Sequence, residues 1–138
     1  MIDRDPLPRW THGRVTLLGD AAHPLYPIGS NGASQGILDA RTLALNLATI
    51  DNPVAALEAY EAIRRPATAA LLHATRGDGP DQVLDMAAER APQGFDDIEA
   101  VLPLAERAES AAHDKRLAGF EPAVLNARPS LNPPRRAA

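Results

Sequence analysis

The pattern of apolar and polar positions predicts one β-strand near the N-terminus and then a series of helices. Arg14 to Leu18 form a short apolar and β-branched run that ends at Gly19, a pattern typical of a buried strand inside an α/β sheet. Residues 1–13 show no periodicity and predict an extended lead-in. Because a lone strand cannot satisfy its own backbone donors and acceptors, we expect its partner strands to come from outside this chain.

A first helix is predicted from Gly32 to about Thr49. Its polar residues recur at spacings of four, three and four, and most of the other positions are apolar; the polar set is Gln35, Asp39, Thr42 and Asn46. This pattern indicates a mostly buried helix with one narrow polar stripe. Such a helix, next to an unpaired strand, predicts that the isolated chain self-associates, pairs with an N-terminal partner chain, or is partly molten around residues 10–50.

A second helix is predicted after Asn52, which can cap it and is followed by a proline in the first turn. Pro66 is expected to interrupt this helix, because an interior proline removes a backbone hydrogen bond. A second piece then runs toward Arg76. We expect Glu61 and Arg65 to form an outer ion pair. The inner face is predicted to hold Leu57, Tyr60 and Ile63.

Shorter helices are predicted in the second half of the chain. One runs from Pro80 to about Arg90, and another begins near Asp96 and Glu99, which have the spacing of a capping box. Pro103 is expected to break or kink that helix, and its continuation stops at Gly119.

Composition narrows the class of protein. The chain has 138 residues, of which 45% are apolar and 23% charged, which is the balance of a soluble globular protein. The absence of cysteine excludes disulfides and thiolate metal sites, and a net charge of −4 argues against nucleic-acid binding. No run is long and apolar enough for a signal peptide or a membrane span, so a cytoplasmic location is the expectation and no membrane partner is expected.

The stretch from Gly19 to Gly36 is the candidate for chemistry. A strand ends at Gly19 and Asp20, and a proline-rich loop then leads through a Gly-Ser-Asn-Gly turn into a helix N-terminus. The first N–H groups of a helix have no intrahelical partners and carry the positive end of its dipole, so they suit a phosphate, a carboxylate or an electron-rich ring carbonyl. The Asp20 carboxylate suits the hydroxyl groups of a sugar or polyol.

Two other interpretations of this stretch are weaker. A phosphate loop requires a lysine after the glycines, and the first lysine of the chain is Lys115. A hydrolase triad of Asp20, His23 and Ser30 lacks the Gly-x-Ser-x-Gly turn that presents such a serine.

The run GRVTLLGDAAHPLYPIGSNGASQGILDA resembles the C-terminal flavin-binding motif of the FAD-dependent aromatic hydroxylases. DNPVAALEAYEAIRRPATAAL resembles the helices that follow this motif in that family. The resemblance covers residues 10 to about 76, and it extends more weakly over the remainder to Pro129. The residue sequence of the motif is most similar to that of the phenazine-type and 3-hydroxybenzoate-type members.

The resemblance implies a fold that is mostly α with one strand, the C-terminal fragment of an α/β FAD-binding fold of the Rossmann-like, para-hydroxybenzoate hydroxylase type. Residues 1–118 would form the C-terminal part of the monooxygenase domain, and residues 119–138 an extended proline-rich tail. The strand and Gly-x-Gly-x-x-Gly motif with which the family begins are absent from this sequence. We therefore expect a fragment, a truncated gene product or half of a split enzyme.

The resemblance also implies roles for residues. FAD would be the cofactor, NADH or NADPH the co-substrate and a small aromatic molecule the substrate. Asp20 would bind the ribityl hydroxyls, Pro27 and Gly29 would lie along the isoalloxazine ring, and the N–H groups of the helix start would face its N1–C2=O edge. The implied cofactor-binding set is Gly19, Asp20, Pro27, Gly29, Asn31, Gly32, Ala33 and Ser34. The alternative is an inactive helical module that binds no cofactor alone or complements a partner chain.

Other polar residues have structural interpretations. His23 is expected to be a hydrogen-bonding loop residue, and Asp39 is expected to cap its helix or pair on it. Arg64 and Arg65 are expected to pair with Glu61 or with a neighbouring element. The remaining histidines lack the spacing of metal ligands.

Overall fold

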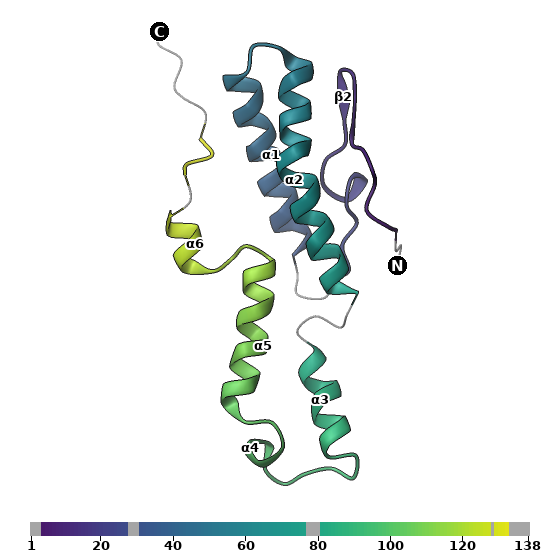
Figure 1. Ribbon diagram of the computed structural model, residues 1–138, viewed down its shortest axis with the longest axis vertical. Coiled ribbons are helices and arrows are strands. Elements are labelled where there is room, and N and C mark those ends of the chain that lie inside the picture. The colour runs from purple at the N-terminus through teal and green to yellow at the C-terminus, as the bar shows by residue number, and fades with distance from the viewer. Residues whose placement is uncertain (1–3, 28–30, 77–80, 128, 133–138) are drawn as a thin grey trace.

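The computed structural model describes residues 4–27, 31–76, 81–127 and 129–132. Figure 1 shows an elongated molecule with two long helices side by side at one end, a small hairpin against one of them, and shorter helices at the other end. In chain order the elements are β1 (Thr11–His12), β2 (Val15–Thr16), the 3-10 turn η1 (Gly19–Ala21), α1 (Gly32–Thr49), α2 (Pro53–Thr75), α3 (Gln82–Arg90), α4 (Ile98–Val101), α5 (Leu104–Leu117) and α6 (Pro122–Ala127). No helix within these ranges has both the length and the apolar character to cross a membrane.

The predicted strand has its partner inside the chain, so the expectation of an unpaired strand is wrong. Val15 and Thr16 pair antiparallel with His12 and Thr11 in the segment predicted to be an extended lead-in. The strand is only two residues long, and Val15 is 66% exposed rather than buried. The chain reverses at Gly13, whose φ of 60° is of the kind that two-residue hairpin turns require.

Helix α2 is capped as predicted but is not interrupted. The Asn52 side chain accepts hydrogen bonds from the N–H groups of Val54 and Ala55, at 2.9 and 3.2 Å. The helix continues through Pro66, contrary to the prediction. Its packing along α1 outweighs the one backbone hydrogen bond that proline removes. Ile63, predicted to face inward, is 55% exposed.

Helix α1 has the predicted bounds but the opposite orientation. Its four buried residues are the members of the polar stripe, Gln35, Asp39, Thr42 and Asn46. By contrast, Ile37 is 63% and Leu47 47% exposed, so the expectation of a mostly buried apolar helix is wrong. A buried polar stripe requires hydrogen-bond partners inside the protein. Asp39 has them in Gly19, before α1, and in Arg64 of α2, and the Gln35 amide also accepts from Arg64.

The core of this end of the molecule is small and includes rings. Trp10, Ala22 and Tyr60 form its buried centre, with Leu7, Leu17 and Leu43 packed against it. The Trp10 ring lies 5.9 Å from the Tyr60 ring, between centroids. The core therefore joins the N-terminal segment to α2.

The shorter helices follow the predicted order with local differences. Asp97, not Asp96, caps α4 by accepting from the Glu99 N–H. The helix breaks before Pro103, and α5 ends as expected before Gly119, which has a φ of 72°. The expectation of an extended tail is wrong for α6 at Pro122–Ala127. The division of the chain at residue 118 and the Rossmann-like fold of a larger domain stay predictions.

Candidate functional site

The site is built on the turn η1, which presents a carboxylate to solvent. Gly19 begins the turn with a φ of 59°, a conformation that favours glycine. The N–H groups of Ala22 and His23 both donate to the Gly19 carbonyl, at 2.8 and 2.9 Å, and close the turn. Asp20 is exposed, and none of the described residues donates a hydrogen bond to its side chain. Its carboxylate is therefore available to an external ligand.

The main chain on both sides of Asp20 is held firmly. The Tyr60 hydroxyl donates to the Leu17 carbonyl at 3.1 Å. From the other side, Nη2 of Arg4 donates to the carbonyls of Ala21 and Ala22, at 2.9 and 3.1 Å. Burial raises the pKa of Tyr60, and the nearby negative charges of Asp39 and Glu61 act in the same direction, so the hydroxyl stays protonated and can donate.

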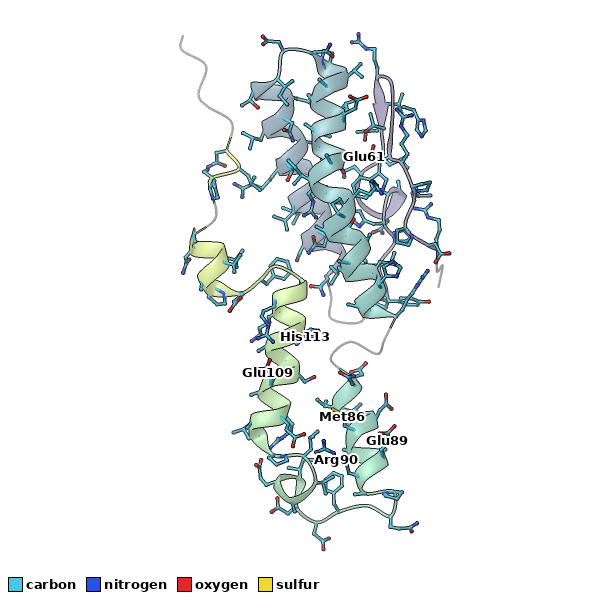
Figure 2. The ribbon with its side chains drawn as sticks, in the orientation of Figure 1. Glu61, Met86, Glu89, Arg90, Glu109 and His113 are labelled. Carbon is cyan, nitrogen blue, oxygen red and sulfur yellow. The ribbon has the colours of Figure 1, made fainter. Side chains whose placement is uncertain are left out.

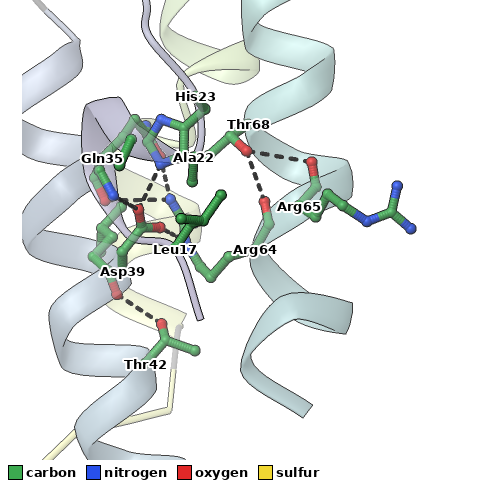
Figure 3. Close-up of polar contacts among 12 residues, drawn as sticks. Leu17, Ala22, His23, Gln35, Asp39, Thr42, Arg64, Arg65 and Thr68 are labelled. Atoms are coloured by element: carbon green, nitrogen blue, oxygen red, sulfur yellow. Dashed lines mark hydrogen bonds and ion pairs between the residues drawn. The ribbon is translucent and has the colours of Figure 1, made fainter. Parts of the chain in front are cut away.

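A buried carboxylate on α1 joins this turn to α2 (Figure 3). Oδ2 of Asp39 accepts from the Gly19 N–H at 3.1 Å and from His23 Nε2 at 2.5 Å. Its Oδ1 accepts from Nε of Arg64 at 2.6 Å. Asp39 is 0% exposed, so this ion pair and its hydrogen bonds lie inside the protein.

Two opposing effects act on the charge of Asp39. Burial alone would raise the pKa of its carboxyl, but hydrogen bonds from His23, Arg64 and the Gly19 N–H lower the pKa below its ordinary value. The ionised carboxylate only accepts hydrogen bonds, so His23 Nε2 carries the hydrogen between them. The His23 ring packs against Trp10, with 5.4 Å between the ring centroids.

Gln35 extends the connection toward the C-terminal helices. Its Oε1 accepts from Nη2 of Arg64 at 2.6 Å, and its Nε2 donates to the Ala118 carbonyl at 3.1 Å. Each polar group of this buried amide therefore has a partner, as burial requires. Gln35 therefore links Ala118, the residue that follows α5, to the same guanidinium that binds Asp39.

The N-terminus of α1 lies against the turn. A Cβ placed on Gly36 would lie 3.9 Å from the Cα of Gly19, so the first turns of α1 run directly beside η1. The Gln35 N–H donates to the Asn31 carbonyl at 3.0 Å, while no described residue accepts from the N–H groups of Gly32, Ala33 and Ser34. The Asn31 side chain does not cap the helix. These amides carry the positive end of the α1 dipole.

The structure thus brings several predicted site residues together. Gly19 and Asp20 form the turn, and the predicted residues from Asn31 to Ser34 form the adjacent helix start. Pro27 is exposed at the end of a described range, and Gly29 lies outside the described residues.

The ion pairs near the site agree with the expected kinds of partner. Arg65 pairs with Glu61 at 3.2 Å, and Arg64 pairs with Asp39 on the neighbouring helix. Glu61 projects from α2 toward the hairpin, where its Oε2 accepts from the Thr11 N–H at 2.7 Å (Figure 2). Among the described residues no group of His, Cys, Asp and Glu has the arrangement of a metal site.

Sequence reasoning missed the connecting role of Asp39, Arg64 and Gln35. Asp39 was expected to act on its own helix, whereas it bridges three segments. The polar stripe was a signal in the sequence, but its spacing does not show that the stripe is buried, and only a buried carboxylate needs a buried partner.

Comparison with known proteins matches residues 4–75, more than half of the chain, to the family described as FAD binding domain. The chain is 62% identical over 76 residues to a phenazine 1,6-dicarboxylic acid hydroxylase of Lysobacter antibioticus, a match covering 55% of this chain and 19% of the relative. It is 52% identical over 69 residues to 3-hydroxybenzoate 6-hydroxylase 1 of Aquipseudomonas alcaligenes, covering 50% and 18%.

A third match extends into the C-terminal helices. The chain is 37% identical over 134 residues to a 3-amino-4-hydroxybenzoate 2-monooxygenase of Streptomyces platensis, covering 93% of this chain and 31% of the relative. The chain therefore spans less than a third of the length of each of these three relatives.

Proposed function

The chain belongs to the FAD-binding domain family of the FAD-dependent aromatic hydroxylases, and from this we propose that residues 19–34 bind the ribityl and isoalloxazine part of FAD. The complete protein is then an NAD(P)H- and oxygen-dependent monooxygenase that hydroxylates an aromatic substrate. The named substrates of the relatives, a phenazine dicarboxylic acid, 3-hydroxybenzoate and 3-amino-4-hydroxybenzoate, support an aromatic acid as the substrate class.

One observation carries this proposal: an exposed carboxylate without a described partner lies on a hydrogen-bonded turn, beside helix N-terminal amides that donate to no described residue. The ribityl chain offers hydroxyl donors, which the Asp20 carboxylate accepts. The flavin ring offers carbonyl acceptors, which the amides of Gly32, Ala33 and Ser34 satisfy. The residues present therefore fit the group.

The helix dipole adds a preference among the charge states of the cofactor. FAD, when bound, would supply the redox chemistry with NAD(P)H and oxygen. The amides at the start of α1 lower the free energy of negative charge on the nearest edge of the flavin, because they carry the positive end of the dipole. The family resemblance implies that Pro27, in the loop before α1, would lie along the ring; the same expectation for Gly29 falls on a residue outside the described ranges.

Titration of the chain with FAD, followed by flavin fluorescence, tests the proposal. We expect Asp20→Asn to weaken FAD binding by roughly 10- to 100-fold, the effect of losing hydrogen bonds to a charged group. The matched control is Asp81→Asn, an exposed aspartate whose side chain does not cap α3. Equal affinity of Asp20→Asn and the unsubstituted chain would refute the role of Asp20.

A second candidate function is a helical module that forms the flavin site only together with another polypeptide. The exposed apolar residues of α1, Ile37 and Leu47, favour it. In that case FAD alone produces no spectral change up to millimolar concentration.

A further inference from the structure

The two ends of the turn that carries Asp20 meet at a single atom. Gly19 precedes Asp20 and His23 follows it by three positions, and both donate to Oδ2 of Asp39. The other oxygen of Asp39 is held by Arg64 of α2 (Figure 3). Asp20 itself receives no hydrogen bond from the described residues, so only the geometry of the turn sets the direction of its side chain.

We propose that Asp39 is a positioning residue, which aims the Asp20 carboxylate at the polyol hydroxyls of its ligand by pinning both ends of the turn. This inference rests on the proposed FAD site but adds a residue that does not touch the cofactor. Asp39 contacts the turn through backbone and imidazole donors and remains fully buried behind it.

The physical reason is the conformational entropy that a loosely held turn loses when a ligand orders it. A carboxylate on a loosely held turn samples many directions, and a ligand that needs one of them must order the turn when it binds. With Gly19 and His23 fixed on Asp39, that ordering is complete before binding. Arg4 holds the carbonyls of Ala21 and Ala22, and the N–H groups of Ala22 and His23 donate to the Gly19 carbonyl, but none of these bonds fixes the Gly19 N–H or attaches the turn to α1.

Only a carboxylate fits the position of Asp39. Donors approach it from two sides, Arg64 on one oxygen and Gly19 with His23 on the other. An asparagine has one accepting oxygen, so its NH2 group must face donors on one side or the other. Arg64 is always charged and can only donate, so the amide oxygen faces Arg64 and the NH2 group faces the turn. Asp39→Asn therefore preserves the shape of the residue and removes the acceptor of the Gly19 N–H.

A double-mutant cycle on FAD affinity in the full chain distinguishes positioning from general stability. We expect Asp39→Asn and Asp20→Asn each to weaken binding by about tenfold or more, and the double variant to bind no more than a few-fold weaker than Asp20→Asn alone. Asp39 then acts through Asp20. Multiplication of the two effects in the double variant would overturn the proposal.

Thr42→Val provides the matched control. Thr42 is buried on the same stripe of α1, but its hydroxyl donates only to the Leu38 carbonyl of its own helix. Its replacement should leave FAD affinity unchanged even where it lowers the melting temperature. If Asp39→Asn does not fold, His23→Phe takes its place in the cycle, since it keeps a ring against Trp10 and removes only the donor to Asp39.

A measurement without flavin separates this inference from the proposed function. Amide hydrogen exchange of Gly19 should become at least about tenfold faster in Asp39→Asn or His23→Phe and stay unchanged in Thr42→Val. Unchanged exchange in the first two variants would overturn the positioning role even if FAD binds. Failure of the unsubstituted chain to bind FAD, with the exchange result as expected, would overturn the proposed function alone.

Discussion

Asp39 gives the chain a specific sensitivity to acid. Its pKa in the folded state lies below the ordinary value of 3.8, because the hydrogen bonds it accepts outweigh the effect of burial. A carboxyl with a lowered folded pKa stabilises the fold above its unfolded pKa, and this contribution is lost as the pH falls through the folded pKa. We expect the free energy of unfolding, measured by urea denaturation, to fall progressively below about pH 4.

Asp39→Asn should change both the size and the pH dependence of that free energy. At pH 7 it leaves Arg64 buried without its anion, at a cost of about 3–5 kcal/mol. Below pH 4 it should lose less stability than the unsubstituted chain. Glu61 makes a separate contribution to the acid sensitivity. Burial alone would raise the pKa of its carboxyl, but hydrogen bonds from the N–H groups of Thr11 and Trp10 lower that pKa below its ordinary value, so Glu61→Gln is the comparison variant. Identical acid slopes for Asp39→Asn and the unsubstituted chain would contradict the assignment.

The two glycines that meet at the turn should respond oppositely to substitution. Gly19 has a φ of 59°, so Gly19→Ala should destabilise the chain by about 1–2 kcal/mol. Gly36 is helical, and a Cβ there makes only an ordinary contact at 3.9 Å, so Gly36→Ala should stabilise by about 0.5–1 kcal/mol. Thermal unfolding measures both. Equal effects would show that backbone conformation does not distinguish the two positions.

The parts of the candidate site that lie close together along the sequence could be predicted from it. Gly19, Asp20 and the start of α1 lie within one short stretch, and a strand pattern followed by Gly-Asp and a helix start indicates their roles. The Asp39–Arg64 pair was not predictable in the same way, because its members are 25 positions apart on different helices. Periodicity shows that Asp39 shares a stripe with other polar residues but does not reveal the cation it meets.

The helix starts provide a comparison of two asparagines. Asn52 at the start of α2 accepts from two backbone N–H groups, whereas Asn31 at the start of α1 makes no side-chain cap. We expect Asn52→Ala to lower the free energy of unfolding by about 1 kcal/mol and Asn31→Ala to leave it nearly unchanged. Chemical denaturation of the two variants measures the difference. A similar loss from Asn31→Ala would mean that its side chain caps α1 in solution.

Local sequence signals predict where the two long helices begin and end better than they predict which residues of these helices are buried. The Asn52 cap and the polar spacing of α1 correctly predicted where these helices lie. They could not predict which face of α1 is buried, since a narrow polar stripe on an apolar helix is compatible with either orientation. The hairpin was missed because its signal, the two-residue turn at Gly13, lies in a segment without strand periodicity.

Among the described residues, polar contacts join the two ends of the molecule. Gln35 reaches the Ala118 carbonyl, and Arg41 of α1 donates to Asn132 at 2.8 Å. The matched family region, residues 4–75, contains the hairpin, α1 and α2. It therefore includes Asp39 and its three partners, Gly19, His23 and Arg64. The end of the molecule that carries the candidate site therefore has its own internal hydrogen bonds and ion pairs. The outer surface of α1 at this end nevertheless exposes the apolar side chains of Ile37 and Leu47.

That outer surface leads to a prediction about association. Ile37 and Leu47 are 63% and 47% exposed while the polar stripe of α1 is buried, so we expect the isolated chain to self-associate. Ile37→Lys with Leu47→Lys should shift sedimentation toward monomer and change the free energy of unfolding by only about 0.5 kcal/mol per site. Leu72→Ala, at a buried position, should instead cost about 2–5 kcal/mol without removing association. Strong destabilisation by the two lysines would mean that this face of α1 is buried within the folded monomer.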